Sequence, residues 1–288
     1  MKIGLIAVNV GGPEAAENLV NLARKAEQVG LDSLWTFEHV IVPLDYQSRY
    51  PYHRSGKFPA SPETSFIDPL IALSHVAGVS KSLRLGTGIN IVPQTNPLLL
   101  AKQAASLDYL SGGRLMLGVG AGWLAEEFQA MGTPFEGRGS RFDDYLVAMK
   151  KVWSGEVVEH QSEYLQWSGF KSYPLPAQKP HMPLIIGGTS GPALKRVVTH
   201  GDGWISVGEP DVLQDCLTRL ANFAADAGRD MSAIEITSVW IYVKEGADSL
   251  SRYEDMGVAR LLIPWQALGE PDPISGLDKL GEQVLARL

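Results

Sequence analysis

Glycines interrupt two strands that the sequence predicts, at positions where a barrel enzyme would hold a ligand. The strand Leu85–Pro93 contains the run LGTGI, and the strand Arg114–Trp123 contains LGVGAGW. Glycine weakens the interior of a strand, so it usually marks a bulge or a place where a ligand meets bare backbone. A helix is predicted between the two strands, over Pro97–Leu110. The pattern therefore predicts a flat cofactor that lies across the mouth of a barrel.

A glutamate and a histidine, Glu38 and His39, follow the second predicted strand, Asp32–Phe37. In a barrel of parallel strands this end is the catalytic rim. A histidine there can donate or accept a proton near neutral pH. The alternative is a structural histidine that caps a loop. The zinc-binding pattern H-E-x-x-H is absent from the sequence, and we predict no metal site.

A third candidate is the segment Ile185–Pro192, with the sequence IIGGTSGP, which combines a strand, a glycine turn and the start of a helix. Backbone N–H groups and hydroxyls at a helix N-terminus favour phosphate. Gly188, Thr189 and Ser190 are therefore candidate phosphate ligands. Alternatively, Ser190 only caps the helix and the glycines only turn the chain.

Composition excludes several classes of protein. The chain has 288 residues, of which 45% are hydrophobic and 20% charged, as in an ordinary soluble enzyme. Its formal net charge of -7 and the lack of a Lys/Arg run argue against nucleic acid as a partner. The single cysteine, Cys216, excludes an internal disulfide and a cysteine-rich metal site. Neither a signal peptide nor a membrane-spanning run is predicted, so we expect a cytoplasmic protein with no membrane partner.

Short apolar strands alternate with helices along the whole chain. The predicted strands are Lys2–Val8, Asp32–Phe37, Leu85–Pro93, Arg114–Trp123, Pro183–Gly188, Gly203–Val207, Ile234–Val243 and Arg260–Pro264. The predicted helices are Glu14–Val29, Ile67–Ser80, Pro97–Leu110, Arg141–Trp153, Pro192–Thr199, Asp211–Ala227, Leu250–Met256 and Leu277–Leu288. This alternation predicts an α/β fold, a closed parallel (β/α)8 TIM barrel formed by a single domain over residues 1–288.

An open, doubly wound sheet is the alternative fold. That fold usually places a glycine fingerprint after its first strand, whereas Asn9–Pro13 lacks the G-x-G-x-x-G spacing. Three long segments interrupt the regular alternation. Two are loop insertions after strands 2 and 4, Val40–Phe66 and Leu124–Ser140, and the third is Ser154–Met182, in which a hairpin is predicted. Long loops of a compact enzyme are usually lids or binding walls; a dimer surface is the other interpretation.

Several motifs together resemble the bacterial luciferase-like superfamily of barrel oxidoreductases, over nearly the whole chain. They are GLDSLW at 30–35 before Glu38 and His39, LGTGI at 85–89, GGRL at 112–115 with LGVGAGW at 117–123, PLIIGG at 183–188 and GDGW at 201–204. Members of this superfamily bind FMN or the deazaflavin F420. The resemblance therefore implies a barrel with a redox cofactor at its mouth.

The resemblance also implies roles for individual residues. A non-prolyl cis peptide, expected at Gly88–Ile89, would press on one face of the tricyclic ring. His39 would donate a proton or orient the substrate, and Glu38 would touch the ring edge; these two are the expected catalytic residues. The expected cofactor contacts are Asn9, Thr87, Gly88, Ile89, Asn90, Gly120, Ala121, Gly122, Trp123, Gly188, Thr189 and Ser190.

The function implied is hydride transfer between coenzyme F420 and a small organic substrate. An FMN-dependent monooxygenase with O2 and a reductase partner is the alternative, and a non-catalytic flavin-binding protein is a further one. The superfamily's sugar-phosphate dehydrogenases have an acidic residue where this chain has Trp123, which argues against a sugar phosphate. An unrelated phosphate-binding barrel with Lys244 as catalytic lysine also remains open. A homodimer through Ile67–Ser80 and Pro97–Leu110 is expected.

Overall fold

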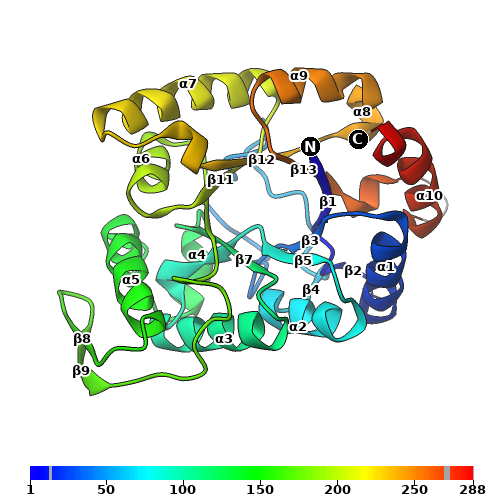
Figure 1. Ribbon diagram of the computed structural model, residues 1–288. Helices are drawn as coiled ribbons and strands as arrows, with labels where there is room; N and C mark the ends of the chain where they lie inside the picture. Colours follow the sequence, from blue (N-terminus) through cyan, green and yellow to red (C-terminus); the bar gives the residue numbers. More distant parts are fainter. Residues whose placement is uncertain (13–14, 269–272, 288) are drawn as a thin grey trace.

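A computed structural model of the chain describes residues 1–12, 15–268 and 273–287. Its centre is a closed barrel of parallel strands (Figure 1). The strands follow one another around the barrel in sequence order, with β1 beside β13 and β7 beside β10. They are β1 (Lys2–Ile6), β3 (Ser33–Thr36), β5 (Arg84–Thr87), β7 (Leu115–Gly120), β10 (Leu184–Gly187), β11 (Gly203–Ser206), β12 (Glu235–Val239) and β13 (Arg260–Pro264). The predicted TIM barrel is confirmed.

Helices cover the outside of the barrel (Figure 1). They are α1 (Ala15–Val29), α2 (Pro69–Val79), α3 (Pro97–Leu110), α5 (Arg138–Trp153), α6 (Gly191–His200), α7 (Pro210–Asp226), α9 (Leu250–Asp255) and α10 (Pro273–Gln283). Local sequence determines where several of them begin. Asp68, Asn96 and Ser190 cap α2, α3 and α6 by accepting N–H groups of the first turn, and a proline follows each cap within two residues. These caps fix where the loops at the barrel mouth end.

The third barrel strand is interrupted where the sequence predicts one continuous strand. After β5 the peptide bond between Gly88 and Ile89 is cis, and β6 (Asn90–Ile91) then resumes the pairing with β7. A short 3-10 turn, η1 (Val92–Gln94), follows. The cis peptide is therefore present at the expected bond, but the end of the predicted strand is a turn instead of extended chain.

The seventh barrel strand is shorter than predicted. β12 ends at Val239, and a short helix, α8 (Tyr242–Glu245), follows it. Ile241 and Val243 are 42% and 65% exposed. A continuous apolar run predicts a buried strand only where both faces of the sheet are covered. The side chains of Ile241 and Val243 are exposed instead, so the strand does not extend to them.

Outside the barrel, β8 (Val158–Gln161) and β9 (Gln166–Phe170) form an antiparallel hairpin, as predicted, that projects from the wall (Figure 1). The last helix begins at residue 273, four positions earlier than expected, and a 3-10 turn, η5, follows at 285–287. Leu288 at the end of that predicted helix, and Glu14 at the start of the first one, lie outside the described residues.

Apolar side chains, Trp35 among them, fill the barrel interior. Trp35 is fully buried and packs in one cluster with Ile6, Met116 and Leu262. A Cβ atom at Gly86 would lie 2.1 Å from the Trp35 ring. Gly86 therefore provides space for the indole, so this glycine of the LGTGI motif serves packing and not a ligand.

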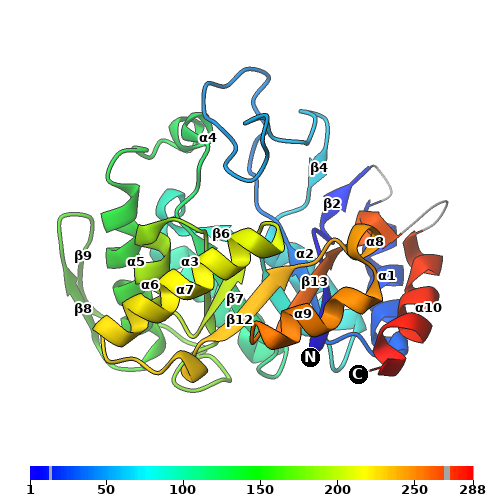
Figure 2. The same cartoon turned by 90° about the horizontal axis from the view of Figure 1, so that it is seen from above.

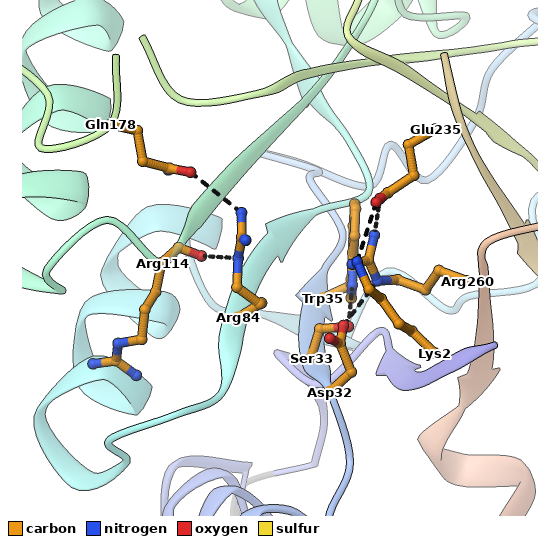
Figure 3. Close-up of polar contacts among 9 residues, drawn as sticks. All are labelled: Lys2, Asp32, Ser33, Trp35, Arg84, Arg114, Gln178, Glu235 and Arg260. Carbon is orange, nitrogen blue, oxygen red and sulfur yellow. Dashed lines mark hydrogen bonds and ion pairs between the residues drawn. The ribbon is translucent and has the colours of Figure 1, made fainter. Parts of the chain in front are cut away.

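Charged side chains close the amino-terminal end of the barrel (Figure 3). The Arg260 guanidinium is 1% exposed and lies between the carboxylates of Asp32 and Glu235, with its Nε 2.9 Å from Asp32 Oδ2. Lys2 Nζ lies 3.4 Å from Glu235 Oε2. At this face of a barrel such residues usually serve stability.

The opposite, carboxyl-terminal end carries the long loops (Figure 2). Residues 37–64, all of them described, contain no helix or strand; β2 (Val10–Gly11) and β4 (Ser65–Phe66) form a small ribbon beside them. A short helix, α4 (Ala125–Ala130), lies in the segment after β7. Among the described residues we find no helix with the length and hydropathy needed to cross a membrane.

Candidate functional site

A cavity of about 610 Å³ lies at the carboxyl ends of the strands. Its lining comes from the loop after β3, from Gly88 and Ile89, from the segment after β7 and from the first turn of α6. Ligand sites of comparable volume are common in enzymes, and barrel enzymes place their chemistry at this end.

Most of the predicted site residues meet in this cavity. Those that line it are Glu38, His39, Gly88, Ile89, Gly120, Ala121, Gly122, Trp123, Gly188, Thr189 and Ser190. Residues that are far apart in the sequence are thus brought together by the barrel closing on itself.

Asn9, Thr87 and Asn90 were also predicted as cofactor contacts, but they are buried behind the lining. The Asn9 amide donates to two backbone carbonyls at the barrel mouth, at 2.8 and 2.5 Å. Thr87 Oγ1 donates to a carbonyl of β7 at 2.7 Å, and Asn90 Nδ2 donates to Glu38 Oε1 at 3.1 Å. In this structure the three side chains support the walls of the cavity.

Two glycines of the motifs make room for the side chain of Ile89. A Cβ at Gly120 would lie 1.9 Å from Ile89 Cδ1, and a Cβ at Gly187 would lie 2.9 Å from Ile89 Cγ2. The glycines therefore allow Ile89 to pack beneath the cavity. Part of the glycine pattern serves this bulge, although the sequence suggested a ligand there.

Glu38 contributes a carboxyl group that protein largely surrounds. Desolvation by burial raises its pKa from 4.5 to about 7, and hydrogen bonds from the Ile91 amide and the Asn90 side chain only partly oppose that increase. The neighbouring charge of Glu127 raises the pKa further. Glu38 can therefore hold or release a proton near neutral pH.

His39 is held by a carboxylate and by aromatic rings. Its Nδ1 lies 3.2 Å from Glu127 Oε2, and its side chain is 7% exposed. The imidazole centroid lies 4.6 Å from that of Phe58 and 6.0 Å from that of Trp123. These contacts fix the ring at the cavity wall, where a histidine can act on a bound substrate.

Aromatic side chains form one wall of the cavity. The Tyr50 ring contacts Phe58 and Trp123, with centroid distances of 5.1 and 5.2 Å. Burial raises the pKa of Tyr50 to about 12 and also raises that of Tyr52. Both phenols therefore stay neutral and can donate a hydrogen bond.

The turn between β10 and α6 forms another wall. Gly188 has a φ of +113°, in a region that favours glycine. Ser190 Oγ accepts from Ala193 N at 3.3 Å, so the predicted helix cap is present. Because the Gly191 amide lies in the first turn of α6, it has no acceptor within the helix. Capping thus coexists with a turn that is open to an anion.

Sequence reasoning missed charged residues of the cavity and its surroundings. Arg138 Nε donates to a carbonyl in the LGVGAGW segment at 3.3 Å, and Arg196 pairs with Asp143 at 2.5 and 2.9 Å. Both arginines line the cavity, and Arg49 lines it as well. The only signal for Arg138 was its place in a predicted insertion. The structure instead puts it in the first turn of α5.

Two further observations concern metal ligands and Lys244. The His, Cys, Asp and Glu residues within the described ranges form no cluster that could hold a metal ion. Lys244 lies in α8 with its side chain 72% exposed, 3.8 Å from Glu209, and it does not line the cavity. Lys244 is therefore not a catalytic lysine of this site.

A sequence profile of the luciferase-like monooxygenase family matches residues 1–254. The chain belongs to this family. An uncharacterized protein of Mycobacterium tuberculosis is 28% identical over 263 residues, which is 91% of this chain and 92% of the relative. F420-dependent hydroxymycolic acid dehydrogenase of the same species is 26% identical over 221 residues, which is 76% of this chain and 56% of the relative.

Flavin-dependent relatives match as well. The oxygenase component of flavin-dependent trigonelline monooxygenase from Acinetobacter baylyi is 28% identical over 172 residues, 59% of this chain and 42% of the relative. Among solved structures, an F420-dependent secondary alcohol dehydrogenase aligns with a TM-score of 0.79 and 18% identity, covering 99% of this chain and 98% of that one. The luciferase-like family thus contains both F420-dependent and flavin-dependent oxidoreductases.

Proposed function

We propose that this luciferase-like protein is an oxidoreductase that uses coenzyme F420 to transfer a hydride to or from a small organic substrate. The observation that carries the proposal is the set of groups that line one cavity. The Gly88–Ile89 bulge, the His39 imidazole and the Gly188 turn all line it. The bulge would support a flat redox ring, the imidazole would transfer a proton, and the Gly188 turn would bind an anion.

The lining residues fit such a cofactor. Gly120, Gly122 and Gly188 line the cavity with their backbone, so a ring and its chain could approach the main chain there. The amino terminus of α6 attracts a phosphate. The cationic side chains of Arg49 and Arg138 add positive charge to the lining, which suits the long anionic tail of F420 better than the single phosphate of FMN.

The bound cofactor would supply hydride chemistry at its central ring. Gly188, Thr189 and Ser190 would bind its phosphate, with Ser190 also keeping α6 capped. His39 would pass a proton to or from the substrate oxygen through Nε2, the ring nitrogen that does not contact Glu127. Glu38 would hold a proton on its carboxyl group near neutral pH.

The aromatic wall supports an apolar or planar substrate. Tyr50, Phe58 and Trp123 pack edge to face or tilted against one another and leave little charge on that side. They would exclude water from the reacting atoms and orient the substrate. A neutral Tyr50 hydroxyl would bind a carbonyl or hydroxyl group without adding charge.

An FMN-dependent monooxygenase is the second candidate. The match to the oxygenase component of a flavin-dependent monooxygenase supports it, and the Gly188 turn would bind the one phosphate of FMN equally well. Such an enzyme would need O2 and a reductase that supplies reduced flavin.

Titration of the purified protein with F420 and, separately, with FMN tests the proposal through the fluorescence of Trp123 and its neighbours. Tight binding of F420 with weak binding of FMN is the expected result. The reverse order would favour the monooxygenase, and binding of neither would overturn both. A bound cofactor that no donor reduces and no acceptor oxidises would indicate a flavin-binding protein without turnover.

We also propose a homodimer through α2 and α3. Ile71 on α2, and Leu99, Tyr109 and Leu110 on α3, are 54–79% exposed. Large apolar side chains on adjacent helices are typical of protein–protein contacts. Light scattering after size exclusion should give twice the 31.3 kDa of one chain. A Leu110→Glu variant should shift the mass to that of one chain, and a wild-type mass of one chain would contradict the dimer.

A further inference from the structure

We infer that Glu127 is a positioning residue that holds His39 with a hydrogen on Nδ1 and so leaves Nε2 as the proton-accepting nitrogen. The inference rests on the proposed role of His39 in proton transfer. Glu127 comes from α4, 88 positions further along the chain, and its side chain is 0% exposed. No sequence motif pointed to it.

The contacts of the Glu127 carboxylate are all with groups that can donate. Oε2 lies 3.2 Å from His39 Nδ1, while Oε1 accepts from the backbone N–H of Val40 at 2.5 Å and of Ile41 at 3.3 Å. An ionised carboxylate only accepts hydrogen bonds. The hydrogen of a neutral imidazole must then be on Nδ1, and the second ring nitrogen carries a lone pair.

Glu127 is the group that decides the tautomer. Within the described part of the chain it is the one residue that bonds to the imidazole. The other faces of the ring meet Phe58, Phe66 and Trp123, which offer no acceptor. The remaining charged or titratable groups of the cavity are Glu38, Arg49, Tyr50, Tyr52, Arg138 and Arg196.

The chain contains a matched control one residue away. Glu126, also on α4, accepts from the backbone N–H groups of Gln47 at 2.6 Å and Ser48 at 3.2 Å. Both glutamates thus attach α4 to the loop of residues 37–64, and the two segments lie at the same end of the barrel (Figure 2). Glu126 makes no contact with a histidine, so comparing the two separates loop attachment from the control of His39.

A glutamine at position 127 changes one contact and can keep the others. Its carbonyl oxygen can still accept from Val40 and Ile41, because a backbone N–H needs only an acceptor. Its NH2 group would then face His39 Nδ1 and donate to it. The imidazole hydrogen would have to move to Nε2, which removes the free lone pair from that nitrogen.

The test is 15N NMR of the imidazole in the cofactor-free protein above pH 8, with His39 assigned by the loss of its signals in His39→Gln. Wild type and Glu126→Gln should show hydrogen on Nδ1, and Glu127→Gln should show it on Nε2. A wild-type signal with hydrogen on Nε2, or no change in Glu127→Gln, would overturn the inference. The wild-type spectrum decides the matter even if Glu127→Gln does not fold.

Turnover then separates this inference from the proposed function. With oxidised F420 and cyclohexanol as probe, the hydride passes to the cofactor and Nε2 accepts the hydroxyl proton. Glu127→Gln should then lower kcat about 10- to 100-fold, as expected for a residue that orients a catalytic group, while KM and cofactor Kd stay within about threefold. Glu126→Gln should leave kcat unchanged. A tautomer change without loss of kcat would overturn the proton-transfer role of His39, whereas an unchanged tautomer would overturn the role of Glu127.

Discussion

The backbones at Thr87 and Gly118 lie so close together that no side chain fits at position 118. The Thr87 hydroxyl donates to the Gly118 carbonyl at 2.7 Å, and a Cβ at position 118 would lie 1.7 Å from the Thr87 carbonyl oxygen. The contact joins β7 to the last residue before the Gly88–Ile89 bulge. The glycine of β7 therefore decides whether the bulge beneath the cavity can form.

Gly118→Ala should lower the free energy of unfolding by about 2–3 kcal/mol, because a backbone oxygen cannot move aside as a flexible side chain can. Cofactor binding should weaken with it, since the bulge lines the cavity. Urea denaturation and the F420 titration measure the two effects. Gly78→Ala is the control: a Cβ in that helix meets nothing within 4 Å, so it should stabilise by about 0.5–1 kcal/mol. Equal stability of the two variants would contradict the packing argument.

Glu38 should make the protein less stable as the pH rises from about 5 to about 7. Its pKa is about 7 in the folded protein and near 4.5 when exposed. Between these values the folded state binds more protons than the unfolded state, so stability falls as the pH rises. The loss is on the order of 3 kcal/mol. Glu38→Gln should remove this part of the pH dependence in urea denaturation at several pH values.

Glu27 is the matched control for that experiment. Hydrogen bonds from Ser82 lower the pKa of Glu27 to about 2. Its stabilising effect is therefore present above pH 4.5 and is lost only as the pH falls toward 2. Glu27→Gln should alter the acid end of the profile and leave the range from 5 to 7 unchanged. An unchanged slope in Glu38→Gln would show that this carboxyl is not protonated in the folded state.

The sequence predicted features that repeat or form motifs, and missed those that depend on distant contacts. Alternating strands and helices predicted the barrel, and the resemblance predicted the cis bond at Gly88–Ile89. The same glycine pattern did not show that Gly86 accommodates Trp35. The contact of Glu127 with His39 was missed because it joins the end of the second strand to a distant insertion, and neither periodicity nor spacing relates residues that far apart.

Arg260→Leu should destabilise the barrel by about 3 kcal/mol without changing cofactor affinity. The substitution removes the guanidinium that lies between Asp32 and Glu235 at the amino-terminal end, and among the described residues only Lys2 still pairs with Glu235 (Figure 3). Neither carboxylate lines the cavity. Arg252→Leu removes an exposed pair with Asp211 and should change stability by less than about 1 kcal/mol. Thermal unfolding compares them, and a similar effect of both would contradict a special role for the buried arginine.

His39 and Gly188 should affect different steps of the reaction. His39→Ala removes the proposed proton-transferring group and should lower kcat by about 100-fold or more, with little loss of cofactor affinity, because in the proposed function the imidazole acts on the substrate. Gly188→Val should raise the Kd of the cofactor instead. A valine would be strained at a φ of +113°, and its Cβ would lie 3.1 Å from Ala193 in the first turn of α6. Stopped-flow turnover and the fluorescence titration separate the two. Unchanged kcat in His39→Ala would remove His39 from the mechanism, and unchanged affinity in Gly188→Val would argue against a phosphate at this turn.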